Sequence, residues 1–290
     1  MQDHVLIATA YNNEVRIYVT YTKELVEEAR NIHHTWPTAS AALGRLLTAG
    51  AMMNFMYKDN TQISLKVLGD GPIGAMTVES NMLGEIRADI KDPNVYLIHN
   101  STQKLAVGEA VGNGYLTVLR KQPSKMPYTS TIELRTGEIG DDLTYYFAVS
   151  EQTPSSVGLG VLVNPDQSIK HAGGFIIQLL PDASEETIVK IEKVLSEVSS
   201  VTDMFEKGLT THAILDKLTG GDFKLLSSSS IHYHCGCTKT LFGESISKLD
   251  DQVLDTLINE DEGAEIVCHY CKKVYNFTKQ ELNEIKLNKH

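Results

Sequence analysis

The chain has 290 residues, of which 42% are hydrophobic, and this is enough material for one large domain and a smaller one. Its formal net charge of −11 argues against binding to nucleic acid or to anionic membranes, because both attract basic surfaces. The N-terminus has no basic segment and the apolar run at residues 5–7 is too short for a signal peptide, so we expect a cytoplasmic protein.

Residues 1–181 have the pattern of an α+β domain, the N-terminal core. Apolar residues at helical spacing predict helices at residues 25–36 and 39–56, and the small residues of the second helix allow close packing. Alternation of apolar and polar residues predicts a mixed or antiparallel sheet. Its strands are expected at residues 15–19, 63–67, 73–78, 85–90, 114–120, 157–163 and 175–180.

Residues 182–231 are expected to form a helical linker. Ser184 can cap a helix whose first turn is acidic, and a second helix at residues 212–218 is stopped by Gly220. The apolar stripe of the first helix comprises Ile188, Ile191, Leu195 and Val198. This stripe indicates either ordinary core packing or a surface that is covered in one state and exposed in another. The serine run at residues 227–230 predicts a flexible joint.

Residues 232–290 are expected to form a small C-terminal zinc-binding domain. An amphipathic helix is predicted at residues 246–258, two strands flank the second cysteine pair, and Thr278 with Glu281 has the spacing of a capping box. A unit of this size with few apolar residues cannot build a large core. We therefore expect a metal ion to supply much of its folding free energy, on the order of 10–16 kcal/mol for structural zinc.

All four cysteines lie in this region, as Cys235-Gly236-Cys237 and Cys268-His269-Tyr270-Cys271. Two close pairs of thiols can supply the complete tetrahedral shell of one zinc ion. Such a site is either a permanent structural metal site or a redox switch. In a switch, oxidation of the thiolates to disulfides releases the zinc, because disulfides no longer coordinate it. In a reducing compartment, metal ligation or redox sensing is favoured over permanent disulfides.

The remaining motifs give no enzyme site. His232, His234 and His269 flank the cysteines, but four thiolates already fill a tetrahedral shell, so we expect these histidines to tune the thiolates. The G-x-G-x-x-G pattern at residues 69–74 contains Pro72 and opens no predicted helix, which favours a hairpin turn over a dinucleotide site. There is no Walker A pattern, no Ser/His/Asp set and no H-E-x-x-H, so we expect neither nucleotide binding nor catalysis.

The chain resembles the 33 kDa heat-shock family of redox-regulated holdase chaperones along nearly its whole length. The two cysteine doublets and the spacing between them match the pattern of that family. The other matching stretches are residues 38–50 (TASAALGRLLTAG), 69–74 (GDGPIG), 173–175 (GGF), 178–181 (QLLP) and 265–271 (EIVCHYC).

This resemblance implies a core, a linker folded over it and a zinc domain that senses the redox state. In the reduced and inactive form, one Zn²⁺ is expected on Cys235, Cys237, Cys268 and Cys271. The resemblance further implies that oxidation forms the disulfides Cys235–Cys237 and Cys268–Cys271, and that the zinc domain then unfolds. The linker loosens, and the protein becomes a homodimer that holds unfolding client proteins without ATP.

Two other functions share the cysteine pattern. A zinc ribbon that contacts nucleic acid would need a basic surface, whereas the chain from Cys235 onward contains seven Lys, no Arg and ten Asp or Glu. A thiol oxidoreductase would use Cys268 and Cys271, but its attacking thiol belongs at a helix N-terminus, and here strands are predicted on both sides. The resemblance favours a chaperone over these two alternatives.

Overall fold

The structure is a computed structural model that describes residues 1–57, 59–123, 125–198 and 200–289. Its contacts divide the chain into two units, Met1–His234 and Cys235–His290. Each unit contains both helices and strands, which confirms the predicted α+β class. Residues 182–231 belong to the first unit, so their separate role as a linker stays a prediction about function.

Each predicted strand and helix of the core overlaps an observed one. The strands of the first unit are β1 (His4–Ala10), β2 (Val15–Tyr21), β3 (Gln62–Gly69), β4 (Ala75–Ser80), β5 (Glu85–Ile90), β6 (Gly114–Lys121), β7 (Tyr128–Glu133), β8 (Ser155–Val163), β9 (Ile169–Leu179), β10 (Phe223–Ser230) and β11 (His232–Tyr233). Its helices are α1 (Lys23–His33), α2 (Pro37–Asn54), α3 (Val107–Val111), α4 (Gly140–Val149), α5 (Glu185–Glu197), α6 (Val201–Glu206) and α7 (Thr211–Thr219).

The strands of the first unit form two sheets. One has the order β10-β1-β2-β9-β8 and the other has the order β11-β5-β4-β3-β6-β7. Within the first sheet neighbouring strands pair antiparallel, whereas in the second the short strand β11 pairs parallel to β5. The last two strands before the second unit therefore lie in different sheets: β10 belongs to the first sheet and β11 to the second.

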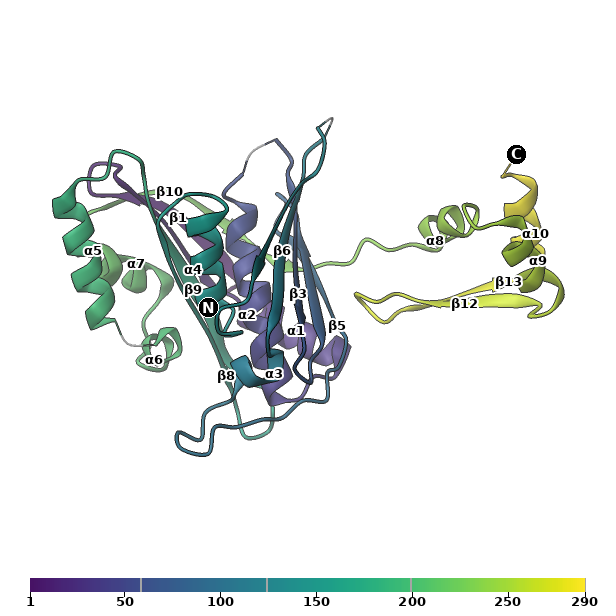
Figure 1. Ribbon diagram of the computed structural model, residues 1–290, viewed down its shortest axis with the longest axis horizontal. Helices are drawn as coiled ribbons and strands as arrows, with labels where there is room; N and C mark the ends of the chain where they lie inside the picture. Colours follow the sequence, from purple (N-terminus) through teal and green to yellow (C-terminus); the bar gives the residue numbers. More distant parts are fainter. Residues whose placement is uncertain (58, 124, 199, 290) are drawn as a thin grey trace. The chain divides into compact units, whose positions relative to one another are not determined.

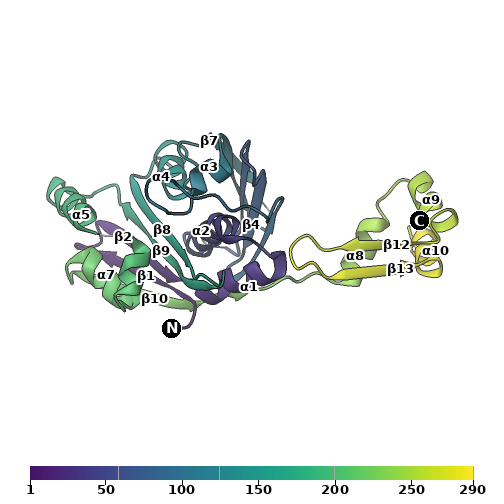
Figure 2. The ribbon, with the colours of Figure 1, turned by 90° about the horizontal axis from the view of Figure 1, so that it is seen from below.

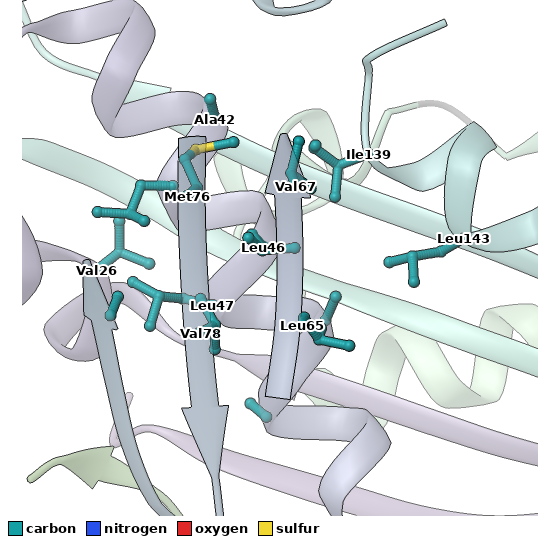
Figure 3. Packing of buried hydrophobic residues seen from close by; sticks show 14 of the residues in the cluster. Val26, Ala42, Leu46, Leu47, Leu65, Val67, Met76, Val78, Ile139 and Leu143 are labelled. Atoms are coloured by element: carbon teal, nitrogen blue, oxygen red, sulfur yellow. The ribbon is translucent and has the colours of Figure 1, made fainter. Parts of the chain in front are cut away.

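Helix α2 lies between the two sheets (Figure 2) and contacts β2, β8 and β9 on one side and β3, β4 and β5 on the other. All its residues except Pro37 and Arg45 are buried, because the helix is packed on both sides and consists largely of Ala, Leu, Met and Gly. A Cβ at Gly50 would lie 2.7 Å from Val78 Cγ1, so the helix packs closer to the sheet than a larger residue would permit. Figure 3 shows Leu46 and Leu47 of α2 against the side chains of β3 and β4.

Helices α5, α6 and α7 cover the outer face of the first sheet (Figure 1). Ile191 of the α5 stripe is 5% exposed, and with the partly buried Leu195 and Val198 it joins a second apolar cluster that includes strand residues such as Ile17 and Ile177. The hydroxyl of Ser184 accepts a hydrogen bond from the Thr187 amide (3.3 Å), which confirms the predicted cap. In this structure the stripe is therefore packed against the core.

The serine run is not a flexible joint, and that prediction was wrong. Residues 223–230 form β10, which pairs along β1 with Leu6 opposite Ser228. Backbone pairing with the neighbouring strand provides this order, although the serine side chains contribute little apolar contact. The serine run is thus part of an edge strand of the first sheet.

The second unit contains α8 (Lys239–Ile246), α9 (Asp251–Asn259), β12 (Gly263–Val267), β13 (Val274–Thr278) and α10 (Lys279–Leu287). The single helix predicted at residues 246–258 is in fact two helices, because α8 ends at Ile246 and Asp250 is the N-cap of α9. The predicted capping box of Thr278 and Glu281 is confirmed at the start of α10.

Candidate metal centre

The backbone of the second unit brings the two cysteine pairs together from distant parts of the sequence. Cys235 and Cys237 lie in an extended segment before α8, and Cys268 and Cys271 lie in the turn that joins β12 to β13. The turn is closed by hydrogen bonds from the Cys268 amide to the Lys273 carbonyl (2.9 Å) and from the Lys272 amide to the Cys268 carbonyl (2.8 Å). The expected strand–turn–strand knuckle is confirmed.

The four sulfur atoms lie within 4.8 Å of one another. The Sγ atoms of Cys235 and Cys268 are 3.6 Å apart, and those of Cys237 and Cys271 are 3.3 Å apart. A tetrahedral zinc ion with Zn–S bonds of about 2.3 Å holds its sulfurs about 3.8 Å apart, whereas a disulfide bond is about 2.05 Å long. The four cysteines are therefore free thiols in an arrangement that fits one tetrahedral ion that prefers sulfur ligands.

Tyr275 of β13 contacts the cysteine cluster from outside. Its hydroxyl donates to the Cys237 carbonyl (2.9 Å) and lies 3.2 Å from Cys237 Sγ. Burial raises the pKa of the Cys237 thiol, but hydrogen bonds with Tyr275 and with the other thiols outweigh it and lower the pKa to about 7. Sequence reasoning missed Tyr275, because the contact spans 38 positions and no local pattern reports it.

Burial also raises the pKa of two neighbouring thiols, and there hydrogen bonds do not outweigh it. It raises the pKa of Cys271 to about 12 and also raises the pKa of Cys235. Without a metal, Cys237 therefore ionises near neutral pH while Cys235 and Cys271 keep their protons. Metal binding must release those protons, so the affinity of the centre for metal rises with pH.

The apolar material around the cysteines is modest. The buried cluster of this unit comprises Ile246, Leu254, Ile258, Cys268, Tyr275, Phe277 and Leu282. One of these residues is itself a candidate ligand, so the metal centre and the core of the unit form one cluster. This supports the expectation that a bound metal stabilises the fold of the unit.

The flanking histidines do not join the four-cysteine group among the residues that the structure describes. His269 is exposed in the turn between Cys268 and Cys271. His232 and His234 belong to the first unit, where they group with Glu85. Residues 69–74 form the expected hairpin between β3 and β4, closed by a hydrogen bond from the Gly69 amide to the Gly74 carbonyl (2.8 Å).

Comparison with known proteins assigns the family. A family model described as Hsp33 protein matches residues 3–278. This chain belongs to the Hsp33 family. Among similar members, the 33 kDa chaperonin of Acholeplasma laidlawii is 47% identical over 288 residues, covering 98% of this chain and 99% of that protein. The 33 kDa chaperonin of Bacillus velezensis is 45% identical, with 98% of each chain covered.

A solved structure agrees with this assignment. The crystal structure of the 33 kDa chaperonin of Thermotoga maritima, a heat shock protein 33 homologue, matches with a TM-score of 0.91 and 31% sequence identity. The match covers 98% of both chains. The Hsp33 fold therefore extends over nearly the whole of this family member. None of its described helices has the length and apolar character needed to cross a bilayer.

Proposed function

We propose that this chain is a redox-regulated, ATP-independent holdase chaperone whose switch is the four-cysteine centre. The observation that carries the proposal is the convergence of Cys235, Cys237, Cys268 and Cys271 in a chain of the Hsp33 family. The names of its relatives, 33 kDa chaperonins, support a chaperone role. We place the protein in the cytoplasm, where unfolding proteins are its clients.

In the reduced state the four cysteines act as ligands of one zinc ion. Zinc, when bound, holds the four thiolates in a tetrahedron and stabilises a unit whose apolar cluster is small. The hydroxyl of Tyr275 supports Cys237 from outside this shell. In this state α5 to α7 cover the first sheet, and the chaperone is inactive.

Oxidation removes the ligands. Peroxide accepts two electrons from each pair of thiols, so that one S–S bond forms and peroxide is reduced to water. We propose the pairs Cys235–Cys237 and Cys268–Cys271. The second unit then loses its metal and unfolds, because its remaining apolar contacts are few.

Unfolding of the second unit would loosen β10, the strand of the first sheet that lies nearest to Cys235 in the chain. β10 is an edge strand with a serine-rich half, so it is weakly held. When α5 to α7 loosen, the sheet residues of their shared cluster, among them Ile17 and Val19, become available to unfolded clients. The active form is proposed to be a homodimer.

Light scattering of a heat-unfolded client protein tests this function. The peroxide-treated protein should suppress aggregation without ATP, and the reduced zinc-loaded protein should not. Equal suppression by both forms would refute redox control, and suppression by neither would refute the holdase role.

A further inference from the structure

A second group of metal-ligating side chains lies in the first unit, at the edge of its six-stranded sheet. Strand β11 pairs parallel to β5 with His232 opposite Glu85. The backbone amides of His232 and His234 donate to the carbonyls of Gly84 and Ile86, each at 2.9 Å. Because residues two apart on a strand share a face, both imidazoles lie on the same side as the Glu85 carboxylate.

The donor atoms of this group are close enough to meet one ion. One nitrogen of each imidazole and one oxygen of Glu85 lie within 4.8 Å of one another. His234 Nε2 is 3.8 Å from Glu85 Oε1, and the two imidazole rings have their centroids 6.0 Å apart. Ligands at about 2.1 Å from a metal are about 3.0–3.4 Å apart, so a small rotation of the exposed rings closes the site.

The carboxylate is already held in place. The Asn81 side-chain amide donates to Glu85 Oε2 (2.7 Å), and Asn81 Oδ1 in turn accepts from the Leu83 amide (3.0 Å) and the Glu85 amide (3.3 Å). Glu85 Oε1, the oxygen opposite the one held by Asn81, is the one near His234. Outer contacts of this kind orient the ligands of metal sites.

We propose that Glu85, His232 and His234 bind one divalent transition-metal ion, in a site that contains no thiol. Two imidazoles and a carboxylate suit ions such as Zn²⁺, Cu²⁺ and Ni²⁺, and they leave further positions to water. Both histidines are exposed, so an ion enters directly from solvent. The chain then carries two metal sites of different chemistry, one of four thiolates and one of imidazole and carboxylate.

The two sites differ in their response to oxidants. Peroxide converts thiolates to disulfides, whereas imidazole and carboxylate ligands are unaffected by that reaction. The thiol-free site therefore keeps its affinity for metal after the cysteines are oxidised. This consequence, unlike the site itself, rests on the proposed oxidation of the four-cysteine centre.

Calorimetric titration of Zn²⁺ into the untagged, reduced, full-length protein with its cysteine site already zinc-loaded tests the site. A second equivalent should bind, and His232→Gln, His234→Gln and Glu85→Gln should each weaken it more than about tenfold. His212→Gln, an exposed histidine on α7, is the matched control and should bind like the parent. Absence of the second equivalent, or equal affinity in the three variants and the parent, would overturn the proposal.

Two further measurements identify the ligands and the effect of oxidation. Cu²⁺ bound at the second site should show coupling to two nitrogens in its electron paramagnetic resonance spectrum, and His234→Gln should reduce this to one. After peroxide treatment and chelation, the chain should still take up one Zn²⁺. If the fully oxidised chain takes up no Zn²⁺, the statement that the thiol-free site keeps its metal affinity after oxidation is wrong. Thiols that resist peroxide would refute the proposed switch, while the titration of the reduced protein still decides the second site.

Discussion

Tyr275 is the residue through which the cysteine cluster is joined to the strand behind it. Its hydroxyl contacts Cys237 at both the carbonyl (2.9 Å) and the sulfur (3.2 Å). Tyr275→Phe removes these contacts and keeps the ring that packs against Phe242. We expect zinc affinity to fall about tenfold, as is usual when an outer partner of a metal ligand is lost.

Competition with a chromophoric chelator measures this change in zinc affinity. Tyr96→Phe is a suitable control, because Tyr96 is 56% exposed and belongs to the first unit. If Tyr275→Phe binds zinc as tightly as the control, the hydroxyl has no role in holding the metal.

Asp3 is a buried carboxyl that caps a helix from outside that helix. The amides of Leu25 and Glu24, at the start of α1, donate to its two oxygens at 2.6 and 3.2 Å. Burial nevertheless raises the pKa of Asp3 from 3.8 to about 6. The folded protein therefore binds this proton more tightly than the unfolded chain does, and its contribution to the free energy of unfolding falls as the pH rises through this range.

Asp3→Asn should make the stability of the first unit less dependent on pH between pH 3.8 and about 6. The parent should lose up to about 1.4 kcal/mol per pH unit relative to the variant. Urea unfolding at a series of pH values measures the difference, with the exposed Asp182→Asn as control. Parallel curves for parent and Asp3→Asn would show that Asp3 ionises normally in the folded state.

Among the elements, α5 provides the clearest test of the covered surface. Ile191 is 5% exposed in the cluster under the helix, whereas Val189 on the same helix is 60% exposed. A carboxylate at position 191 must leave the apolar cluster, and loss of the isoleucine alone costs about 2–5 kcal/mol. Ile191→Asp should therefore loosen α5 and suppress client aggregation in the reduced protein.

Val189→Asp is the matched control for this experiment, because it adds the same charge at an exposed position of the same helix. It should leave the reduced protein inactive. Activity in both variants, or in neither, would show that the surface under α5 is not the one that binds clients.

Strand β10 gives a second prediction at the scale of elements. Paired edge strands protect the amides that point toward their neighbour, whereas a flexible joint protects none. Hydrogen exchange of peptides covering residues 223–230 should show partial protection in the reduced protein and loss of protection after oxidation. Full exchange in the reduced protein would contradict the pairing with β1.

The helices and strands that could be predicted from the sequence are those whose own residues have a clear local pattern. Helix α2 is rich in Ala, Leu and Met, and α5 begins with a serine cap and carries an apolar stripe, so both were predicted. Strand β10 was missed because serine has little preference for strands, and only pairing with β1 makes it one. The single helix expected at residues 246–258 was wrong because α8 ends at Ile246 and residues 247–250 separate it from α9.

The residues of the two candidate sites also differ in whether a local sequence pattern reveals them. The grouping of the four cysteines could be predicted, because two close cysteine pairs can supply the tetrahedral shell of one metal ion. Neither Tyr275 nor Glu85 could be found this way, because Tyr275 reaches Cys237 across 38 positions and Glu85 lies opposite His232 only through the pairing of β11 with β5. Such contacts depend on the tertiary fold, which a single sequence does not report.

At the scale of the whole molecule, the two units differ in what stabilises them. The first has two apolar clusters around α2 and under α5 to α7, whereas the second has one small cluster that includes Cys268. Removing metal with a chelator under reducing conditions should therefore unfold Cys235–His290 and leave the first sheet folded. Hydrogen exchange resolves the two units, and protection of the second unit without metal would show that metal is not needed for its fold.

Oxidation of the four thiols is proposed to release the metal and to uncover the sheet under α5 to α7. The most direct test follows zinc release, free thiols and protease cleavage within α5 to α7 in the same samples during exposure to peroxide. We expect that four thiols are lost for each zinc released, and that cleavage rises with zinc release and reverses on reduction with added zinc. Complete release of zinc with unchanged cleavage of α5 to α7 would contradict it.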